Sequence, residues 1–284
     1  MGQGSTVTAR ELSGRGLAAA IRAEAAKAAA ELAGAGRPPR LAVVTATDDQ
    51  ASAAYVRAIA GAAAKAGIAC DLLRTGTAGG VAATLAQLAD DPEVHGIILQ
   101  TPLPDGGRLA ELAEAIPVAK DVDGASPRSL GRLAAGLPAF IPATAAAVVA
   151  LLDDYKVPLA GRHAVVVGRS VVVGKPVAHL LLDRDATVTV CHSRTADLAA
   201  ITRQADVLVA AAGRAGLISA AHVSPGATVI DIGASATDDG GLAGDVAPPV
   251  SDLAAALSPV PGGVGPVTTA LLLRHVTQAA ARLP

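Results

Sequence analysis

At 284 residues, the chain has room for two domains with their own hydrophobic cores, and 51% hydrophobic with 17% charged residues indicates a globular protein rather than a disordered one. The net charge of −2 provides no basic excess for binding nucleic acid or an anionic membrane, and two cysteines are too few for a disulfide framework or a zinc cage, so we expect no metal. No proline-free uncharged run is long enough to span a membrane, and residues 1–20 lack the apolar core of a signal peptide, so we predict a cytoplasmic protein.

The first half of the chain alternates between strand and helix patterns. In chain order we expect a helix at 17–32, a strand at 40–45, a helix at about 52–66, a strand at 68–73, a helix at 81–89 and a strand at 95–100. A short helix at 109–116 and a Gly-, Pro- and Asp-rich crossing between domains at 117–142 follow. This alternation predicts a parallel α/β layer domain.

The second half repeats the alternation. We expect a helix at 145–155, a strand at 164–167, a helix at 177–182, a strand at 187–191, a helix at 196–203, strands at 206–210 and 227–231, a hairpin through 238–245 and a last helix from 266 to about 282. The predicted fold class is therefore α/β, with two domains that each contain a parallel sheet.

A glycine loop follows the strand at 164–167. Gly168 lies where the buried strand must turn, and Gly174 opens the next helical pattern. Strand, glycine turn and helix N-terminus together can bind the phosphates of a dinucleotide. The spacing is neither Gly-x-Gly-x-x-Gly nor a Walker A loop, so a plain strand–helix turn remains an alternative.

The next strand end bears on the choice of cofactor. A NAD site would place an Asp or Glu there to bind the ribose hydroxyls, but no acid appears before Asp197. The strand end offers Ser193 and Arg194, and the glycine loop offers Arg169. Hydroxyl and guanidinium groups suit a 2′-phosphate, which favours NADP over NAD, although these residues could also be solvated loop residues.

Polar residues also follow the strands of the first domain. Gln100 comes directly after the strand at 95–100, Tyr55 lies one turn into the helix after the first strand, and Asp121 and Asp123 occur in the crossing. Ligands collect at the carboxyl ends of parallel strands, and these groups would suit a neutral heterocycle with amide-like edges. The alternative is a surface tyrosine, a strand-end glutamine and two loop acids.

Several motifs in this order resemble the bifunctional methylenetetrahydrofolate dehydrogenase/methenyltetrahydrofolate cyclohydrolase family (FolD type). They extend from about residue 9 to the C-terminus at the family's spacing, and the Lys-Asp-Val-Asp-Gly and Pro-Val-Pro-Gly-Gly-Val-Gly-Pro runs are highly specific. The matching segments are Ala51-Ser52-x-x-Tyr55-Val56, Gly96-Ile97-Ile98-Leu99-Gln100-Thr101-Pro102-Leu103-Pro104, Lys120-Asp121-Val122-Asp123-Gly124, Gly168-Arg169-Ser170-x-x-Val173-Gly174-x-Pro176, Gly244-Asp245-Val246 and Pro259 to Pro266.

The resemblance implies a folate-binding domain at 1–142 and 266–284, with the C-terminal helix returning to it, and a Rossmann-type NADP domain at 143–265. It implies a folate substrate and a homodimer formed through the second domain. Carried over to this sequence, the catalytic and substrate-binding residues would be Tyr55, Gln100 and Asp123, with Pro261, Gly262 and Gly263 closing over the folate. The cofactor-binding residues would be Gly168, Arg169, Ser170 and Ser193, with Thr144 and Gly265 near the nicotinamide.

One departure from the family pattern concerns activity. The family's main cyclohydrolase group is a lysine four residues after the tyrosine, and Ile59 occupies that position here. Positions i and i+4 share a helix face, whereas Arg57 projects elsewhere and Lys65 lies roughly 15 Å along the axis. We therefore expect an NADP-dependent methylenetetrahydrofolate dehydrogenase with weak or absent cyclohydrolase activity. Open alternatives are a paralogue acting on another C–N bond and a catalytically silent NADP- or folate-binding protein.

Overall fold

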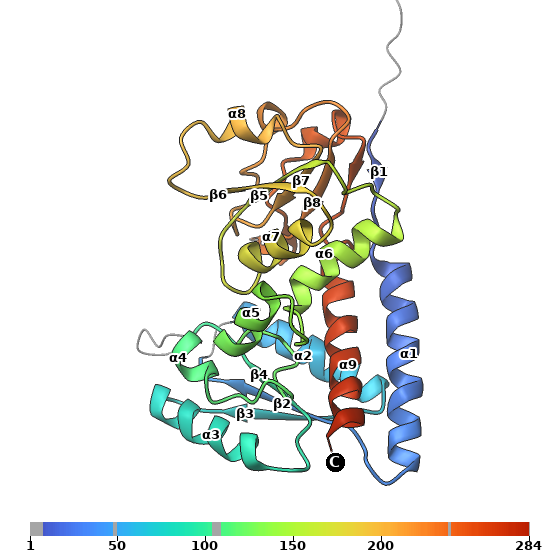
Figure 1. Cartoon of the computed structure of the whole chain (residues 1–284), viewed down its shortest axis with the longest axis vertical. Coiled ribbons are helices and arrows are strands. Elements are labelled where there is room, and N and C mark those ends of the chain that lie inside the picture. The colour runs from blue at the N-terminus through green and yellow to red at the C-terminus, as the bar shows by residue number, and fades with distance from the viewer. Residues whose placement is uncertain (1–7, 48–49, 104–108, 238–239, 284) are drawn as a thin grey trace, which may run out of the picture. The chain divides into compact units, whose positions relative to one another are not determined.

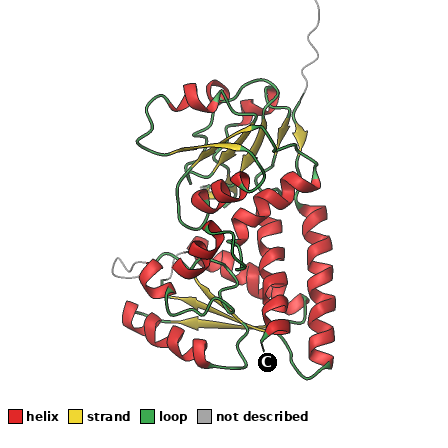
Figure 2. Cartoon of the chain, viewed as in Figure 1, coloured by secondary structure: helices red, strands yellow, loops and turns green. Residues whose placement is uncertain are grey.

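The chain folds into two compact units, and a computed structural model describes residues 8–47, 50–103, 109–237 and 240–283. The three-stranded unit comprises Ala18–Ala143 and Thr268–Pro284, and the six-stranded unit comprises Met1–Leu17 and Thr144–Val267. In each unit the strands lie at the centre and helices lie around them (Figures 1 and 2). The predicted α/β fold with two parallel sheets is confirmed.

The three-stranded sheet has the order β3-β2-β4, with both pairs parallel. Its strands are β2 (Arg40–Thr45), β3 (Ala69–Arg74) and β4 (Gly96–Leu99). Its helices are α1 (Arg15–Gly34, from residue 18), α2 (Gln50–Lys65), α3 (Ala78–Asp90), α4 (Leu109–Ala113), α5 (Pro127–Ala134) and α9 (Val264–Arg282, from residue 268). None of the helices in the described part of the chain is long and apolar enough to cross a membrane.

Both faces of this sheet are buried, because successive side chains of a strand point to opposite faces. Leu41 and Val43 of β2 pack into a cluster with residues of α1, α2 and α9, whereas Ala42 and Val44 pack against α3 and α4. All four side chains have no exposed surface. The two helical layers therefore fix β2.

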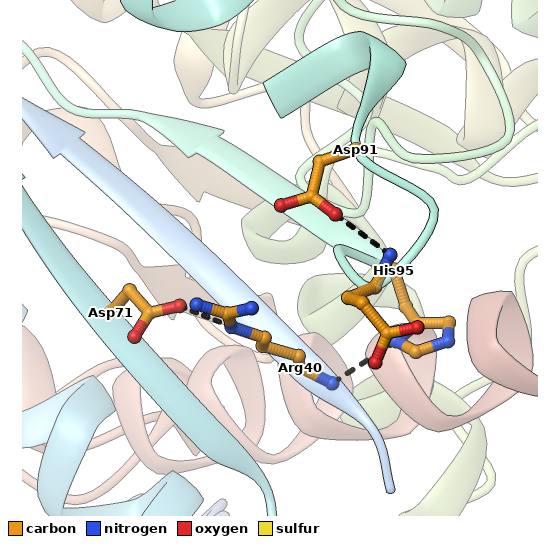
Figure 3. Close-up of polar contacts among 5 residues, drawn as sticks. Arg40, Asp71, Asp91 and His95 are labelled. Carbon is orange, nitrogen blue, oxygen red and sulfur yellow. Dashed lines mark hydrogen bonds and ion pairs between the residues drawn. The ribbon is translucent and has the colours of Figure 1, made fainter. Parts of the chain in front are cut away.

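The amino end of β2 is fixed by polar contacts instead. Figure 3 shows Arg40 with its guanidinium on the carboxylate of Asp71, 2.6 Å away, and its backbone N–H donated to Nδ1 of His95 at 3.2 Å. His95 must be neutral at Nδ1 to accept that bond, and burial lowers its pKa. This cluster lies at the opposite strand end from the edge where ligands bind in parallel sheets.

The segment 117–142, which we expected to be an irregular crossing, contains α5. Ser126 precedes this helix, and its hydroxyl accepts the backbone N–H of Ser129 at 3.2 Å. Pro127 occupies the first helical position, where its missing N–H costs nothing. Cap and proline together start a short helix within a sequence whose composition indicates a loop.

The six-stranded sheet is parallel throughout, in the order β1-β11-β8-β7-β5-β6. Its strands are β1 (Arg10–Glu11), β5 (His163–Val167), β6 (Thr187–Cys191), β7 (Val207–Ala210), β8 (Thr228–Asp231) and β11 (Ala256–Leu257). The helices are α6 (Ala143–Asp154), α7 (Gly174–Leu182) and α8 (Leu198–Thr202), with 3₁₀ turns at Ala220–His222 and Pro248–Asp252. The hairpin pairs β9 (Ser235–Ala236) with β10 (Leu242–Ala243).

The chain runs from β5 outward to β6 and then returns to β7 on the other side of β5. The connections after β5 and β7 therefore diverge, and such a switch point in a parallel sheet is where ligands bind. The loop after β5 begins at Gly168, and the loop after β7 begins at Ala211.

The N-terminal strand β1 joins this unit rather than the three-stranded one. Arg10 pairs with Ala256 of β11, and its guanidinium lies 4.9 Å from the ring centroid of Tyr155. The Tyr155 hydroxyl donates to the carbonyl of Ser13 at 3.1 Å. Our boundaries group residues 1–142 together, whereas in the structure the described residues up to Leu17 belong with the six-stranded unit.

The last helix is tied to the three-stranded unit by a buried histidine. His275 of α9 is 7% exposed, and its Nδ1–H donates to the carbonyl of Val122 at 2.8 Å. Its ring lies 5.0 Å from that of Phe140, centroid to centroid. Burial lowers the pKa of His275 to about 4. The neutral imidazole therefore holds the segment that carries Asp123 against α9.

This pKa makes the protein sensitive to acid. The unfolded state binds a proton at His275 near pH 6.5 and the folded state only near pH 4, so folding loses stability as the pH falls from 6.5 to 4. Between pH 7.5 and 5 we expect His275 to contribute about 2 kcal/mol of this loss. Urea unfolding at both pH values measures it, and His275→Asn, which keeps an N–H donor without the titration, should lose correspondingly less. Equal losses in the two proteins would contradict this account.

Candidate functional site

A cavity of about 410 Å³ lies at the switch point of the six-stranded sheet. It is bounded by the loops that follow β5, β6 and β7, the three neighbouring strands at that end of the sheet. The lining residues are Val167, Gly168, Arg169, Ser170, His192, Ser193, Thr195, Leu198, Ala211, Ala212, Arg214 and Leu217. The structure thus brings together the four residues for which the sequence predicts contact with the dinucleotide's phosphates and ribose.

The turn after β5 requires glycine at two positions. Gly168 has φ +141°, and a Cβ there would lie 2.1 Å from the carbonyl oxygen of Ala211. A Cβ on Gly174 would lie 2.3 Å from the carbonyl oxygen of Gly168. The chain therefore passes close to both β7 and the start of α7, which leaves backbone at the position where a dinucleotide's phosphates bind in such folds.

The polar side chains of this turn have different surroundings. Arg169 and Ser193 are exposed at the cavity, and no hydrogen bond to either side chain is found within the described residues. The Ser170 hydroxyl accepts the N–H groups of Val173 and Gly174, at 3.2 and 3.4 Å, so it also closes the turn. Two open donors and a hydroxyl fit the anionic end of NADP, and no acidic residue lines the cavity.

The loop after β7 is held by a buried pair of carboxylates. Asp245 accepts the N–H groups of Ala212, Gly213 and Arg214 at 2.6–2.9 Å. Its own N–H donates to Asp231, which is 4% exposed and whose pKa is raised by burial. The Gly-Asp-Val motif thus shapes the cofactor cavity without lining it. Among the lining residues that our sequence analysis did not assign to the site, Arg214 is the arginine, and no local motif marks it.

Thr144 and Gly265 are not among the residues that line this cavity. They lie in the first turns of α6 and α9, Thr144 half-buried and Gly265 exposed. Their predicted place near the nicotinamide stays a prediction.

The loop Pro261–Gly263 is rigid and belongs to the six-stranded unit. Gly262 has φ +116°, and its carbonyl accepts the N–H of Gly14 at 2.9 Å. A Cβ on Gly14 would lie 2.0 Å from the carbonyl oxygen of Gly263, so the two segments are in close backbone contact. Tyr55, Gln100 and Asp123 belong to the three-stranded unit.

Tyr55 and Gln100 lie at the carboxyl end of the three-stranded sheet. The Gln100 amide and the Ser52 hydroxyl both donate to the carbonyl of Thr101, at 2.9 and 2.7 Å. That shared acceptor fixes Gln100 beside the first turn of α2, where Tyr55 follows Ser52 by one turn. Burial raises the pKa of the Tyr55 phenol above its ordinary value, and the charge of Asp123 adds to the shift. Tyr55 and Asp123 are therefore neighbours.

In the Lys-Asp-Val-Asp-Gly run, Lys120 and Asp121 make hydrogen bonds that support the fold. Lys120 donates to the carbonyls of Leu88, Ala89 and Asp91 at 2.6–3.2 Å and so ends α3. Asp121 accepts the N–H groups of Ala125 and Ser126 at 3.2 and 2.9 Å. A ligand-binding role for Asp123 stays a prediction. Burial, with the charge of Asp121, raises its pKa to about 7, so both its protonated and ionised forms occur at neutral pH.

Ile59 is a core residue. It has no exposed surface and packs in the cluster that contains Val56, Ile98 and Val122, with Tyr55 at its edge. Arg57 and Lys65 face elsewhere, because they line a separate cavity of about 560 Å³ between α1 and α2 together with Arg22. Neither cation reaches the position of the family lysine, as expected from helix geometry.

These features define a class: a two-unit α/β protein with a cavity at the switch point of the parallel sheet in one unit, and with Tyr55, Gln100 and Asp123 in the other. Two family models match the chain, the tetrahydrofolate dehydrogenase/cyclohydrolase catalytic domain over residues 12–123 and the NAD(P)-binding domain of the same family over residues 142–283. The chain belongs to the tetrahydrofolate dehydrogenase/cyclohydrolase family, and the family resemblance of its motifs is confirmed.

Relatives and solved structures agree with this assignment. The chain is 62% identical to the bifunctional protein FolD 1 of Saccharopolyspora erythraea over 98% of this chain and 96% of the relative. The bifunctional FolD methylenetetrahydrofolate dehydrogenase/cyclohydrolase of Campylobacter jejuni has a TM-score of 0.91 at 38% identity, covering 95% and 98%. The FolD enzyme of Trypanosoma brucei, solved with NADP and an inhibitor, also has a TM-score of 0.91, at 35% identity, covering 97% and 98%.

The turn at Gly168 provides a test of the cavity. Gly168→Ala should lower the unfolding temperature more than Gly216→Ala, because Gly216 also has a positive φ but open space where a Cβ would lie. It should also abolish dinucleotide binding, measured by titration calorimetry. Comparable unfolding temperatures and intact binding in both variants would contradict the close contact with Ala211.

Proposed function

We propose that this chain oxidises 5,10-methylenetetrahydrofolate to 5,10-methenyltetrahydrofolate with NADP+ in one-carbon metabolism, and that its cyclohydrolase activity is weak or lost. Support for the dehydrogenase activity comes from membership of a family named for both dehydrogenase and cyclohydrolase activities. The observation that carries the loss is the buried Ile59 at the position of the family lysine.

The residues present suit hydride transfer. NADP+, when bound, supplies the acceptor for the hydride that leaves the N5–CH2–N10 carbon, and the nitrogen lone pairs stabilise the product cation. The step depends on alignment of two bound partners more than on an acid or base. Arg169, Ser170 and Ser193 would hold the cofactor, and Gly168 would give its phosphates access to backbone N–H groups.

The folate would be oriented by Tyr55, Gln100 and Asp123. The ionised Asp123 carboxylate accepts hydrogen bonds from a heterocycle's N–H groups, and its raised pKa lets it also bind as the acid. Gln100, fixed by its bond to the carbonyl of Thr101, would offer an amide edge to the heterocycle. Pro261, Gly262 and Gly263 would close over the folate, and Thr144 and Gly265 would lie near the nicotinamide.

Hydrolysis of the methenyl bridge needs more than alignment. Water must be activated, and cleavage of the C–N bond is assisted by proton transfer, which is typically worth 10²–10⁴-fold. An isoleucine neither donates nor accepts a proton, and Ile59 adds a dry wall next to Tyr55. We therefore expect hydrolysis to suffer far more than hydride transfer.

One assay tests this proposal against its alternatives. Purified protein with methylenetetrahydrofolate and NADP+ should produce both NADPH and methenyltetrahydrofolate, followed by absorbance. If neither NADPH nor methenyltetrahydrofolate forms, two alternatives are left: a paralogue that acts on another C–N bond, and a catalytically silent NADP- or folate-binding protein. Added methenyltetrahydrofolate should disappear at close to the buffer rate, and hydrolysis well above that rate with Ile59 in place would show that the lysine is dispensable.

Ile59→Lys should restore part of the hydrolysis, up to the 10²–10⁴-fold that acid–base assistance provides. The recovery should be incomplete because hydrophobic side chains surround residue 59. Burying a lysine ammonium among them costs free energy. Ile59→Met is the matched control, since it is unbranched like lysine but has no amine. The two variants should differ in hydrolysis and agree in dehydrogenase turnover. Equal hydrolysis by both would mean that space, and not the amine, limits the reaction.

Cofactor choice depends on Arg169. NADP+ should outperform NAD+, and Arg169→Ala should raise the KM for NADP+ about tenfold or more, with little effect on NAD+, because a charge-assisted bond to the 2′-phosphate is lost. Lys175→Ala, which removes a nearby exposed cation outside the cavity, serves as control. Equal use of both cofactors by the unmutated protein would reject the assignment.

We also propose that the protein is cytoplasmic, that its three-stranded unit binds folate and that its six-stranded unit binds NADP. We further propose a homodimer formed through the six-stranded unit. Support comes from β6, an edge strand on which Val190 is 40% exposed, next to α7, where Leu182 is 53% exposed. An unpaired apolar edge favours pairing with another chain.

Light scattering measures the dimer directly. Val190→Lys should shift the protein from dimer to monomer, because a lysine on an edge strand blocks pairing. Leu72→Lys is the control, since Leu72 is an exposed apolar residue on β3, an edge strand of the other sheet. Dissociation by Leu72→Lys alone would place the interface in the other unit.

A further inference from the structure

The dinucleotide cavity carries a second cation besides Arg169. Arg214 lines it from the loop after β7, whereas Arg169 lines it from the loop after β5 and Ser193 from the end of β6. Of the residues that line the cavity, none is an Asp or a Glu. Two arginines from different loops therefore line one cavity whose lining residues include no carboxylate.

The backbone of Arg214 is fixed although its side chain is exposed. Its N–H donates to Asp245 at 2.7 Å, in a loop whose preceding N–H groups bind the same carboxylate. Asp245 is itself fully buried and held by Asp231. The guanidinium has no hydrogen bond or ion pair in the described part of the chain. The fold thus presents an unused cation from a rigid support, which reduces the entropy lost when an anion binds.

The cavity corresponds to the adenosine end of a dinucleotide. The pyrophosphate in such folds lies at the N-terminus of the helix after the first strand, and the ribose hydroxyls lie at the end of the second strand. None of the residues of α7 lines this cavity, whereas Ser193 and Thr195 after β6 do. Leu198 and Leu217 give it apolar walls suited to an adenine ring.

We propose that Arg214 is a specificity-determining residue, which binds the 2′-phosphate of NADP together with Arg169 and Ser193. This inference rests on the proposed use of NADP. A 2′-phosphate neutralises both guanidinium groups, which otherwise repel each other across the cavity. NAD offers only a hydroxyl there and leaves both charges uncompensated. Discrimination between the cofactors therefore comes from three loops rather than from the glycine turn alone.

The test uses the full chain and fragments of the cofactor, so it requires no turnover. Titration calorimetry with 2′,5′-ADP and with 5′-AMP separates the 2′-phosphate from the rest of the adenosine end. The unmutated protein should bind 2′,5′-ADP more tightly. Arg214→Gln should weaken 2′,5′-ADP about tenfold, as expected for one lost charge-assisted bond, and change 5′-AMP less than twofold. Arg214→Lys should recover part of the affinity.

Arg162→Gln removes the same charge from an exposed position of this unit outside the cavity and should change neither ligand. If the unmutated protein does not distinguish the two ligands, the proposed cofactor itself is wrong. If it does, but Arg214→Gln behaves like Arg162→Gln, the role of Arg214 is overturned while NADP use stands. Equal weakening of both ligands by Arg214→Gln would also overturn it, because Arg214 would then bind a group that the two ligands share.

Discussion

Asp231 is a buried carboxylate on which the cofactor side of this protein depends. A charge that is 4% exposed is tolerated only if hydrogen bonds replace its water, and the N–H groups of Gly233, Asp245 and Val246 do so at 2.8–2.9 Å. Asp245, which is also buried, repeats the arrangement and accepts three N–H groups of the loop after β7. The backbone at Gly244 passes so close to the Asp231 carboxylate that no side chain fits at this position. A Cβ on Gly244 would lie 1.9 Å from a carboxylate oxygen of Asp231.

In the three-stranded unit, the polar contacts that support the fold come from adjacent residues of the sequence. Lys120 ends α3, Asp121 supports the turn into α5, and the carbonyl of Val122 accepts from His275. These three neighbours are occupied with the fold, which leaves Asp123 in the site with burial as the main cause of its raised pKa. Of these four adjacent residues, Asp123 is the one that we propose for ligand binding.

Sequence patterns predicted what depends on local order. The buried strands, the turn at Gly168 and the family motifs could be identified because strand periodicity and glycine geometry are local properties. The place of Arg214 could not, since it depends on hydrogen bonds to Asp245, a residue far along the chain. The strand β1 was missed because two exposed residues, Arg10 and Glu11, show no apolar alternation. The residues proposed for the folate occur in both units, and the sequence alone assigns their roles only through the family.

Neither unit is built from one continuous stretch of chain. The six-stranded sheet needs β1 from the beginning of the chain to pair with β11, and the core of the three-stranded unit needs Leu272, Leu273 and Val276 from the last helix. During synthesis, therefore, the six-stranded sheet cannot be completed until β11 has left the ribosome, and the core of the three-stranded unit cannot be completed until α9 has left it. Contacts between residues so distant in sequence slow folding and leave apolar surface open for longer. The nascent chain is thus exposed to aggregation until its last residues are made, and chaperones that shield apolar surface should act on it late.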